Sequence, residues 1–163
     1  MIGEYIKILL NTQIELRELK QIITNNKFSS TNEYLINYSV IKASGSLEVV
    51  YKKIFFDCLS AGSTQFTQTY LEKIILDSSS NPSINQITRI LSKINNDLSK
   101  EFSQNIPDLK KNNLNSLVKL RNSFAHGNRI NTSIDTILEY FRSGCHVIIH
   151  LYKILHKKTI LSP

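Results

Sequence analysis

The fold of this chain is indicated by one stretch near its C-terminal third, Leu117-Val-Lys-Leu-Arg-Asn-Ser-Phe-Ala-His-Gly-Asn-Arg129. Its apolar residues recur at spacings of three and four, which is typical of one face of an α-helix. Gly127 follows the last turn, where glycine commonly ends a helix because it tolerates a left-handed backbone. The stretch therefore predicts the C-terminal end of an amphipathic helix that runs from about Asp108 to His126.

Arg121 does not fit the pattern of that helix. With about 100° of rotation per residue, the neighbouring apolar positions fall within about 60° of Arg121 on both sides. A guanidinium stays charged, and burying an isolated charge is costly, so Arg121 needs either a carboxylate partner or an opening onto a polar cleft. Asn122 and His126 are four residues apart on the adjacent flank. An arginine, an amide and an imidazole thus share one arc at a helix end, which suits the binding and chemistry of a phosphate.

The overall composition is that of an ordinary globular protein. The chain has 163 residues, of which 41% are hydrophobic and 20% charged, which suits one domain with its own core. Its net charge of +7 favours polyanionic partners, although a solvated lysine-rich surface is the simpler explanation. The apolar N-terminal run carries Glu4 and Lys7, which argues against a signal peptide, and no apolar run approaches the roughly 18 residues of a membrane span. We expect a cytoplasmic, single-domain protein (residues 1–163) with a basic C-terminal tail at about 157–163.

The sequence predicts no cofactor and no metal site. Cys58 and Cys145 stand alone in apolar segments without CxxC spacing, which is typical of buried free thiols. His146 and His150 are four residues apart, a spacing that metal sites use, but no third ligand stands nearby. We interpret them as ordinary half-buried histidines.

The hydrophobic pattern predicts an all-α fold, a helical bundle of about five to six helices with two long antiparallel helices. Asn81 is expected to cap the fourth helix, with Pro82 in its first turn. Ser44-Gly45-Ser46 lies inside the second helix, where small residues either weaken a helix or let another helix approach closely; the continuing apolar pattern favours close approach. The expected helices cover about residues 4–24, 31–61, 65–77, 82–98, 108–126 and 132–155.

Two further features need partners from elsewhere in the fold. Glu48 lies among apolar residues of the second helix, and two interpretations stay open: it pairs with Arg121, or it faces solvent beside Lys52 four residues later. The last helix carries apolar residues at alternating spacings of four and three from Ile134 to Leu155. Such a stripe packs against an antiparallel neighbour or against a dimer mate.

Two stretches resemble a known family. Leu117 to Gly127 resembles the signature of the HEPN superfamily (higher eukaryotes and prokaryotes nucleotide-binding), in which an arginine and a polar residue precede a histidine. Here the spacing is Arg-x4-His, from Arg121 to His126, with Asn122 as the polar residue. The run Ala43-Ser-Gly-Ser-Leu-Glu-Val49 is similar to an earlier helix of the stand-alone prokaryotic branch called RiboL-PSP-type HEPN. The resemblance covers most of the chain in architecture, but only these two stretches in residues.

The resemblance implies a metal-independent endoribonuclease with Arg121, Asn122 and His126 as its catalytic motif. We expect Glu48 to support this motif if it pairs with Arg121. The implied reaction is transesterification, in which the ribose 2′-hydroxyl attacks the adjacent phosphorus and leaves a 2′,3′-cyclic phosphate and a 5′-hydroxyl. His126 is expected to act as general base or acid because imidazole titrates near neutral pH. Arg121 is expected to hold the phosphate and stabilise charge on its oxygens, and Asn122 to orient the backbone or the histidine.

The resemblance also implies partners. One histidine cannot easily serve as base and acid on opposite sides of a phosphorus, and HEPN proteins typically dimerise so that two motifs share one cleft. We therefore expect RNA as substrate, a homodimer, and a role as a toxin or antiphage effector beside an antitoxin or defence partner, with Lys119 and Arg129 as candidate RNA contacts. HEPN toxins under nucleotidyltransferase control usually carry a tyrosine two residues after the histidine, whereas this chain has Asn128. The alternatives are a non-catalytic HEPN module for nucleotide or RNA binding or dimerisation, and a helical adaptor with a basic surface.

Overall fold

The computed structural model describes the backbone of residues 2–159 and the side chains of residues 2–156. Every regular element in this range is helical, which confirms the predicted all-α class. The predicted basic tail at 157–163 falls outside the described side chains and stays a prediction. The elements are α1 (Ile2–Asn25), α2 (Asn32–Ser60), α3 (Gln65–Leu71), a short π-helix η1 (Glu72–Leu76), α4 (Ile84–Ile94), α5 (Asn96–Asn105), α6 (Asp108–Ala125) and α7 (Ile134–Thr159).

The described residues thus form seven α-helices, so the expected count of five to six was too low. The difference arises at Asn95, where the pattern predicted one helix continuing to Leu98. Asn95 adopts an extended backbone (φ −163°, ψ 125°), and its side-chain oxygen accepts a hydrogen bond from the amide of Asp97 at 2.7 Å. Asparagine at this position caps a new helix, so α5 begins within the stretch that the sequence assigned to one helix.

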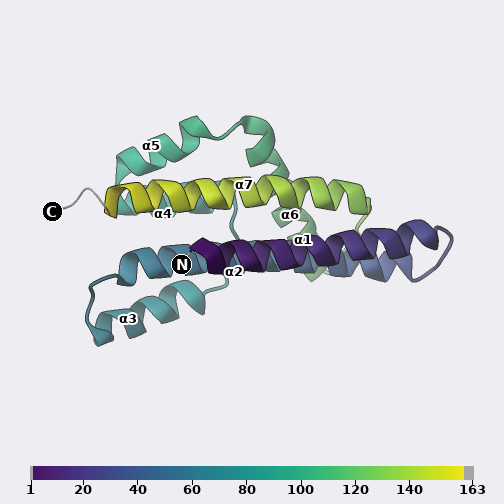
Figure 1. Ribbon diagram of the computed structural model, residues 1–163, viewed down its shortest axis with the longest axis horizontal. Helices are drawn as coiled ribbons and strands as arrows, with labels where there is room; N and C mark the ends of the chain where they lie inside the picture. Colours follow the sequence, from purple (N-terminus) through teal and green to yellow (C-terminus); the bar gives the residue numbers. More distant parts are fainter. Residues whose placement is uncertain (1, 160–163) are drawn as a thin grey trace.

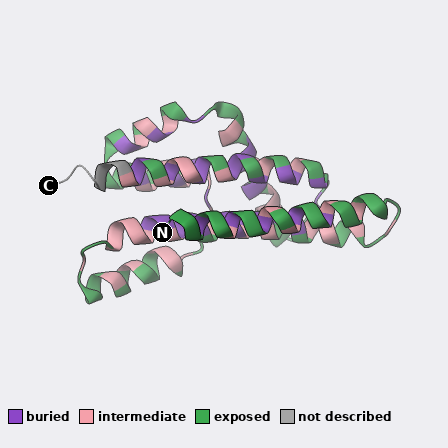
Figure 2. Cartoon of the chain, viewed as in Figure 1, coloured by how far each residue is buried: buried purple, intermediate pink, exposed green. Residues whose placement is uncertain are grey.

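Three long helices, rather than two, form the body of the molecule (Figure 1). The chain reverses after α1, so α2 returns beside it in the opposite direction, and α7 packs along both. The side chains between these helices are fully buried, among them Leu16, Leu47 and Phe141 (Figure 2). The apolar stripe of α7 is used inside this body, because Ile134, Leu138, Phe141, Ile148 and Leu155 are all buried against neighbouring helices of the same chain.

A close approach of two helices lies at Gly144 rather than at Gly45. A Cβ atom at Gly144 of α7 would meet Leu47 Cδ1 of α2 at 2.4 Å, whereas a Cβ at Gly45 would meet nothing within 4 Å. The expectation of close approach therefore fails for Gly45 itself. Its neighbours Ser44 and Ser46 are buried, so the small-residue run still lies partly in the core.

The segment formed by α3 and η1 packs loosely on the outside of the body. Neither element contains a buried residue, and Phe66, Tyr70 and Ile74 are exposed (Figure 2). No helix among residues 2–159 is long and apolar enough to cross a membrane.

Candidate active site

The site begins at the C-terminal end of α6, and a local backbone motif sets its shape. Gly127 has a φ of +78°, and its amide donates to the carbonyl of Phe124 at 2.9 Å. The amide of Asn128 donates to the carbonyl of Ser123 at 3.1 Å. These two bonds form a Schellman motif, which satisfies the last carbonyls of the helix and turns the chain away. Gly127 thus ends α6 as the sequence predicts.

This ending leaves the side chain of His126 exposed at the helix end. The amide of His126 donates to the carbonyl of Asn122 at 3.1 Å, so the two residues lie one helical turn apart on the same face. The exposed imidazole lies at the C-terminal end of α6, where a ligand can reach it. The position suits a group that exchanges protons with a bound ligand.

Arg121 is half-buried and has no carboxylate partner among the described residues. Its guanidinium makes one long hydrogen bond, from Nη1 to Oδ1 of Asn122 at 3.4 Å. A guanidinium carries five N–H donors, so most of the donors of Arg121 are left for water or a ligand. Of the two options that the sequence left open for Arg121, the structure lacks the carboxylate partner among the described residues.

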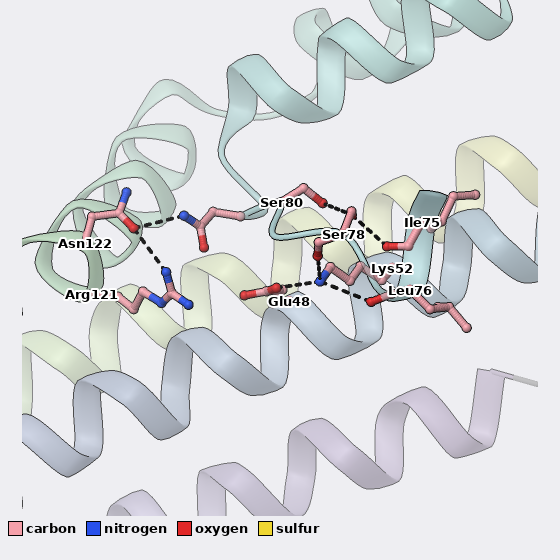
Figure 3. Close-up of polar contacts among 9 residues, drawn as sticks. Glu48, Lys52, Ile75, Leu76, Ser78, Ser80, Arg121 and Asn122 are labelled. Atoms are coloured by element: carbon pink, nitrogen blue, oxygen red, sulfur yellow. Dashed lines mark hydrogen bonds and ion pairs between the residues drawn. The ribbon is translucent and has the colours of Figure 1, made fainter. Parts of the chain in front are cut away.

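Glu48 forms its ion pair with Lys52, which corrects the expected pair with Arg121. Lys52 Nζ lies 2.6 Å from Glu48 Oε1, and both side chains are largely buried, with 11% and 17% of their surface exposed. In Figure 3 the side chains of Glu48 and Arg121 extend toward the same space from α2 and α6, but no bond joins them. The carboxylate prefers Lys52 because an i,i+4 partner on the same helix is always within reach.

Lys52 also holds the segment between η1 and α4. Its ammonium donates to the carbonyl of Ser78 and, at 3.4 Å, to the carbonyl of Leu76 (Figure 3). A buried ammonium has three donors, and here a carboxylate and two carbonyls occupy them. Glu48 therefore supports the site indirectly. It pairs with Lys52, and Lys52 in turn holds the segment between η1 and α4.

The same segment reaches the motif through Asn81, which sequence reasoning assigned to a different role. The side-chain amide of Asn81 donates to Oδ1 of Asn122 at 2.9 Å. Asn81 is free to do so because Ser83, and not Asn81, caps α4, accepting from the amide of Gln86 at 3.3 Å. The oxygen of Asn122 thus accepts from both Asn81 and Arg121, which fixes the orientation of its amide. The sequence carried no local signal for this contact, because Asn81 and Asn122 lie 41 residues apart along the chain.

The two candidate RNA contacts have different surroundings. Lys119 is exposed beside a surface hollow between α6 and α7, and it forms no ion pair with another described residue. Arg129 is exposed but already bound, with Nε 3.0 Å from Oε1 of Glu33 and Nη2 donating to Oε2 at 3.1 Å. Lys119 is therefore the better placed of the two to meet an incoming phosphate.

No group of three or more histidine, cysteine or acidic side chains gathers at one point within the described part of the chain. The chemistry available at this site is that of a guanidinium, an amide and an imidazole.

A family model describes this chain. The RiboL-PSP-HEPN model matches residues 8–157, which includes both stretches that carry the resemblance. The chain belongs to the RiboL-PSP-type HEPN family. No curated protein and no solved structure matches it significantly. The family is associated with ribonuclease activity, and its helical-bundle fold agrees with the seven α-helices of residues 2–159.

Proposed function

We propose that this HEPN protein acts as one domain and is a metal-independent endoribonuclease that works as a dimer. The observation that carries the proposal is the uncompensated charge of Arg121 on the helix that ends at an exposed His126, with Asn122 in contact with both residues. A half-buried guanidinium with most of its donors unused is available to a ligand, and a phosphodiester has the matching charge and geometry. We infer a role as a toxin or antiphage effector, with an antitoxin or defence protein as partner.

The proposed reaction needs no group beyond the side chains and the RNA. One imidazole takes the proton of the ribose 2′-hydroxyl, and the resulting oxygen attacks the adjacent phosphorus. Arg121 neutralises charge on the non-bridging oxygens as the transition state forms. A second imidazole gives a proton to the departing 5′-oxygen, so the products are a 2′,3′-cyclic phosphate and a 5′-hydroxyl. Asn122, held by Asn81, positions the guanidinium.

A second chain would supply the second imidazole, and the surface of α2 supports such an association. Tyr34, Tyr38, Ile41 and Val49 are exposed on this helix, with 40% to 74% of each residue's surface accessible. Contiguous apolar surface of this kind is common at protein interfaces. Sedimentation of the protein at micromolar concentration should give a dimer, and a monomer under conditions of full activity would rule out the shared site.

The test of the activity is RNA cleavage by the wild-type protein and by His126→Ala, both in the presence of a chelator. We expect the wild type to cleave with the chelator present and to leave cyclic-phosphate ends, while the variant loses at least about 100-fold in rate. Cleavage that persists in His126→Ala, or that disappears with chelator in the wild type, contradicts the mechanism. His146→Ala, an exposed histidine on α7, is the matched control. RNA binding without cleavage by either form would favour the non-catalytic module instead.

A mixing experiment tests the shared site directly. Wild-type chains are mixed with His126→Ala chains at a fixed total concentration and allowed to exchange. If each cleft needs an imidazole from both chains, the heterodimers are inactive, so the cleavage rate falls as the square of the wild-type fraction. Two independent sites predict a rate in direct proportion to that fraction, and this result contradicts the shared site.

A further inference from the structure

The segment that holds Asn81 also forms the wall of a cavity outside the proposed active site. This cavity measures about 490 Å³ and lies between the C-terminal half of α2, the α3–η1 segment and α4. Its walls are mostly apolar, with Phe55, Ile75 and Ile90 among them, and Ser78 to Ser80 complete one side. Ligand sites in proteins are typically apolar cavities of about 300–1,000 Å³ with a few polar groups.

The charges around the cavity have one sign. Arg89 and Lys93 lie four residues apart on α4 and line the cavity, while no acidic side chain does so among the described residues. Neither cation belongs to an ion pair in the described part of the chain, and the one hydrogen bond of Arg89 goes to the neutral amide of Gln86 at 2.6 Å. Two adjacent uncompensated cations beside apolar walls match a molecule with one anionic end.

A buried hydroxyl gives a second, independent indication. Tyr51 is 1% exposed and lines the cavity, and no described residue meets its hydroxyl within ordinary hydrogen-bond distance and angle. Burial raises the pKa of Tyr51 to about 12, and weak hydrogen bonds to the side chains of Ser80 and Gln86 lower it in part. A buried hydroxyl with only weak partners is costly, and a polar atom of a ligand would reduce that cost.

We infer that this cavity binds a small amphipathic anion free in solution, with an apolar body of about ten heavy atoms and one carboxylate or comparable group. The apolar body lies against the isoleucines, and the anionic end meets Arg89 and Lys93. The ligand also contacts Ser78 to Ser80, whose chain continues to Asn81 and so to Asn122. Occupancy therefore adds contacts to the segment that orients the Asn122 amide. Binding itself does not depend on the proposed ribonuclease activity.

Calorimetry with three probes of equal chain length tests the inference. Octanoate should bind at one site per chain, and at least about tenfold more tightly than 1-octanol or octylamine, because one charge-assisted bond contributes about that factor. Uridine monophosphate, an anion without an apolar chain, should bind no better than octylamine at this site. Equal binding of all three octyl compounds, no binding of octanoate, or competition by the nucleotide for the octanoate site overturns the proposal.

Two variants of equal charge change locate the site. Arg89→Gln/Lys93→Gln should weaken octanoate binding at least about tenfold, and both residues are exposed, so folding should be kept. Arg142→Gln/Lys153→Gln removes two exposed cations from α7 and should leave binding unchanged. An equal loss of octanoate affinity in both variants means non-specific attraction and overturns the site.

Nuclear magnetic resonance tests the link to the motif. At saturating octanoate the side-chain amide resonances of Asn81 and Asn122 should shift, and unchanged resonances overturn that link. A wild-type protein that binds octanoate but cleaves no RNA would contradict only the proposed function.

Discussion

Lys52 on α2 and Arg121 on α6 are two cations with different surroundings. Lys52 is largely buried and has a carboxylate and two backbone carbonyls as partners. Arg121 is half-buried and has one long hydrogen bond to a neutral amide (Figure 3). A buried charge with all its donors used contributes to the fold, whereas one with most donors unused is available to a ligand.

The partners of Lys52 and Arg121 also come from different parts of the chain. The Lys52 region is self-contained, since its carboxylate is one helical turn away and its carbonyls belong to the adjoining segment. The Arg121 region depends on that segment, because Asn81 extends from it to the oxygen that Arg121 also uses. Four experiments test this division, from the largest expected effect to the smallest.

Arg121→Gln should abolish activity and leave the fold intact. Removal of a donor that stabilises transition-state charge costs about 100- to 1,000-fold in rate, while loss of an unpaired charge should change the free energy of unfolding by less than about 0.5 kcal/mol. Single-turnover RNA cleavage and urea unfolding measure the two quantities. Arg142→Gln, an exposed arginine on α7, is the control and should change neither. A large loss of stability in Arg121→Gln would show that this arginine is structural after all.

Lys52→Met should have the opposite profile. It leaves the carboxylate of Glu48 buried without a partner, and such a change costs about 3 kcal/mol in the free energy of unfolding. Urea unfolding checks the value. In the double variant Glu48→Gln/Lys52→Met the unpaired charge is gone, so part of the stability should return. A stability of Lys52→Met equal to that of wild type would mean that the ion pair contributes little.

Asn81→Ala tests the connection between the two regions. It removes one hydrogen bond to Asn122 and should cost about 1 kcal/mol, with a decrease of roughly tenfold in cleavage rate if Asn122 orients Arg121. Asn85→Ala, an exposed asparagine on α4, provides the comparison. If Asn81→Ala lowers stability but not the cleavage rate, the bond serves the fold alone.

Tyr51→Phe tests the interior near Lys52 through its alkaline response. The pKa of Tyr51 is raised from its ordinary value of 10.0 to about 12, mainly by burial. Below the ordinary value the contribution to stability is complete, and it is lost as the pH rises because the unfolded chain ionises first. The wild type should therefore lose about 1 kcal/mol from this tyrosine between about pH 9 and pH 11, and Tyr51→Phe should show a flatter alkaline profile. Identical profiles would mean that other groups, such as Tyr5 or Cys145, dominate the alkaline response.

Several features of the site could be predicted because their information is local. Gly127 ends α6 because a residue with a left-handed backbone lets the following amides bond to the last carbonyls of the helix. The spacing of Asn122 and His126 places them one turn apart on the same helix. The partners of these side chains could not be predicted in the same way. Asn81 is 41 residues from Asn122 along the chain, and only the packing of the η1–α4 segment brings the two amides together.

The sequence by itself determined the all-α class, most helix ends and the motif, because helical periodicity and capping act over a few residues. It also contained enough to identify the family, whose model covers residues 8–157. The tertiary structure alone decided that α7 approaches α2 at Gly144, that Lys52 holds the η1–α4 segment, and that Arg121 has no carboxylate. These outcomes depend on contacts between helices far apart in the chain, where the choice among several charged and polar partners is made by packing rather than by spacing.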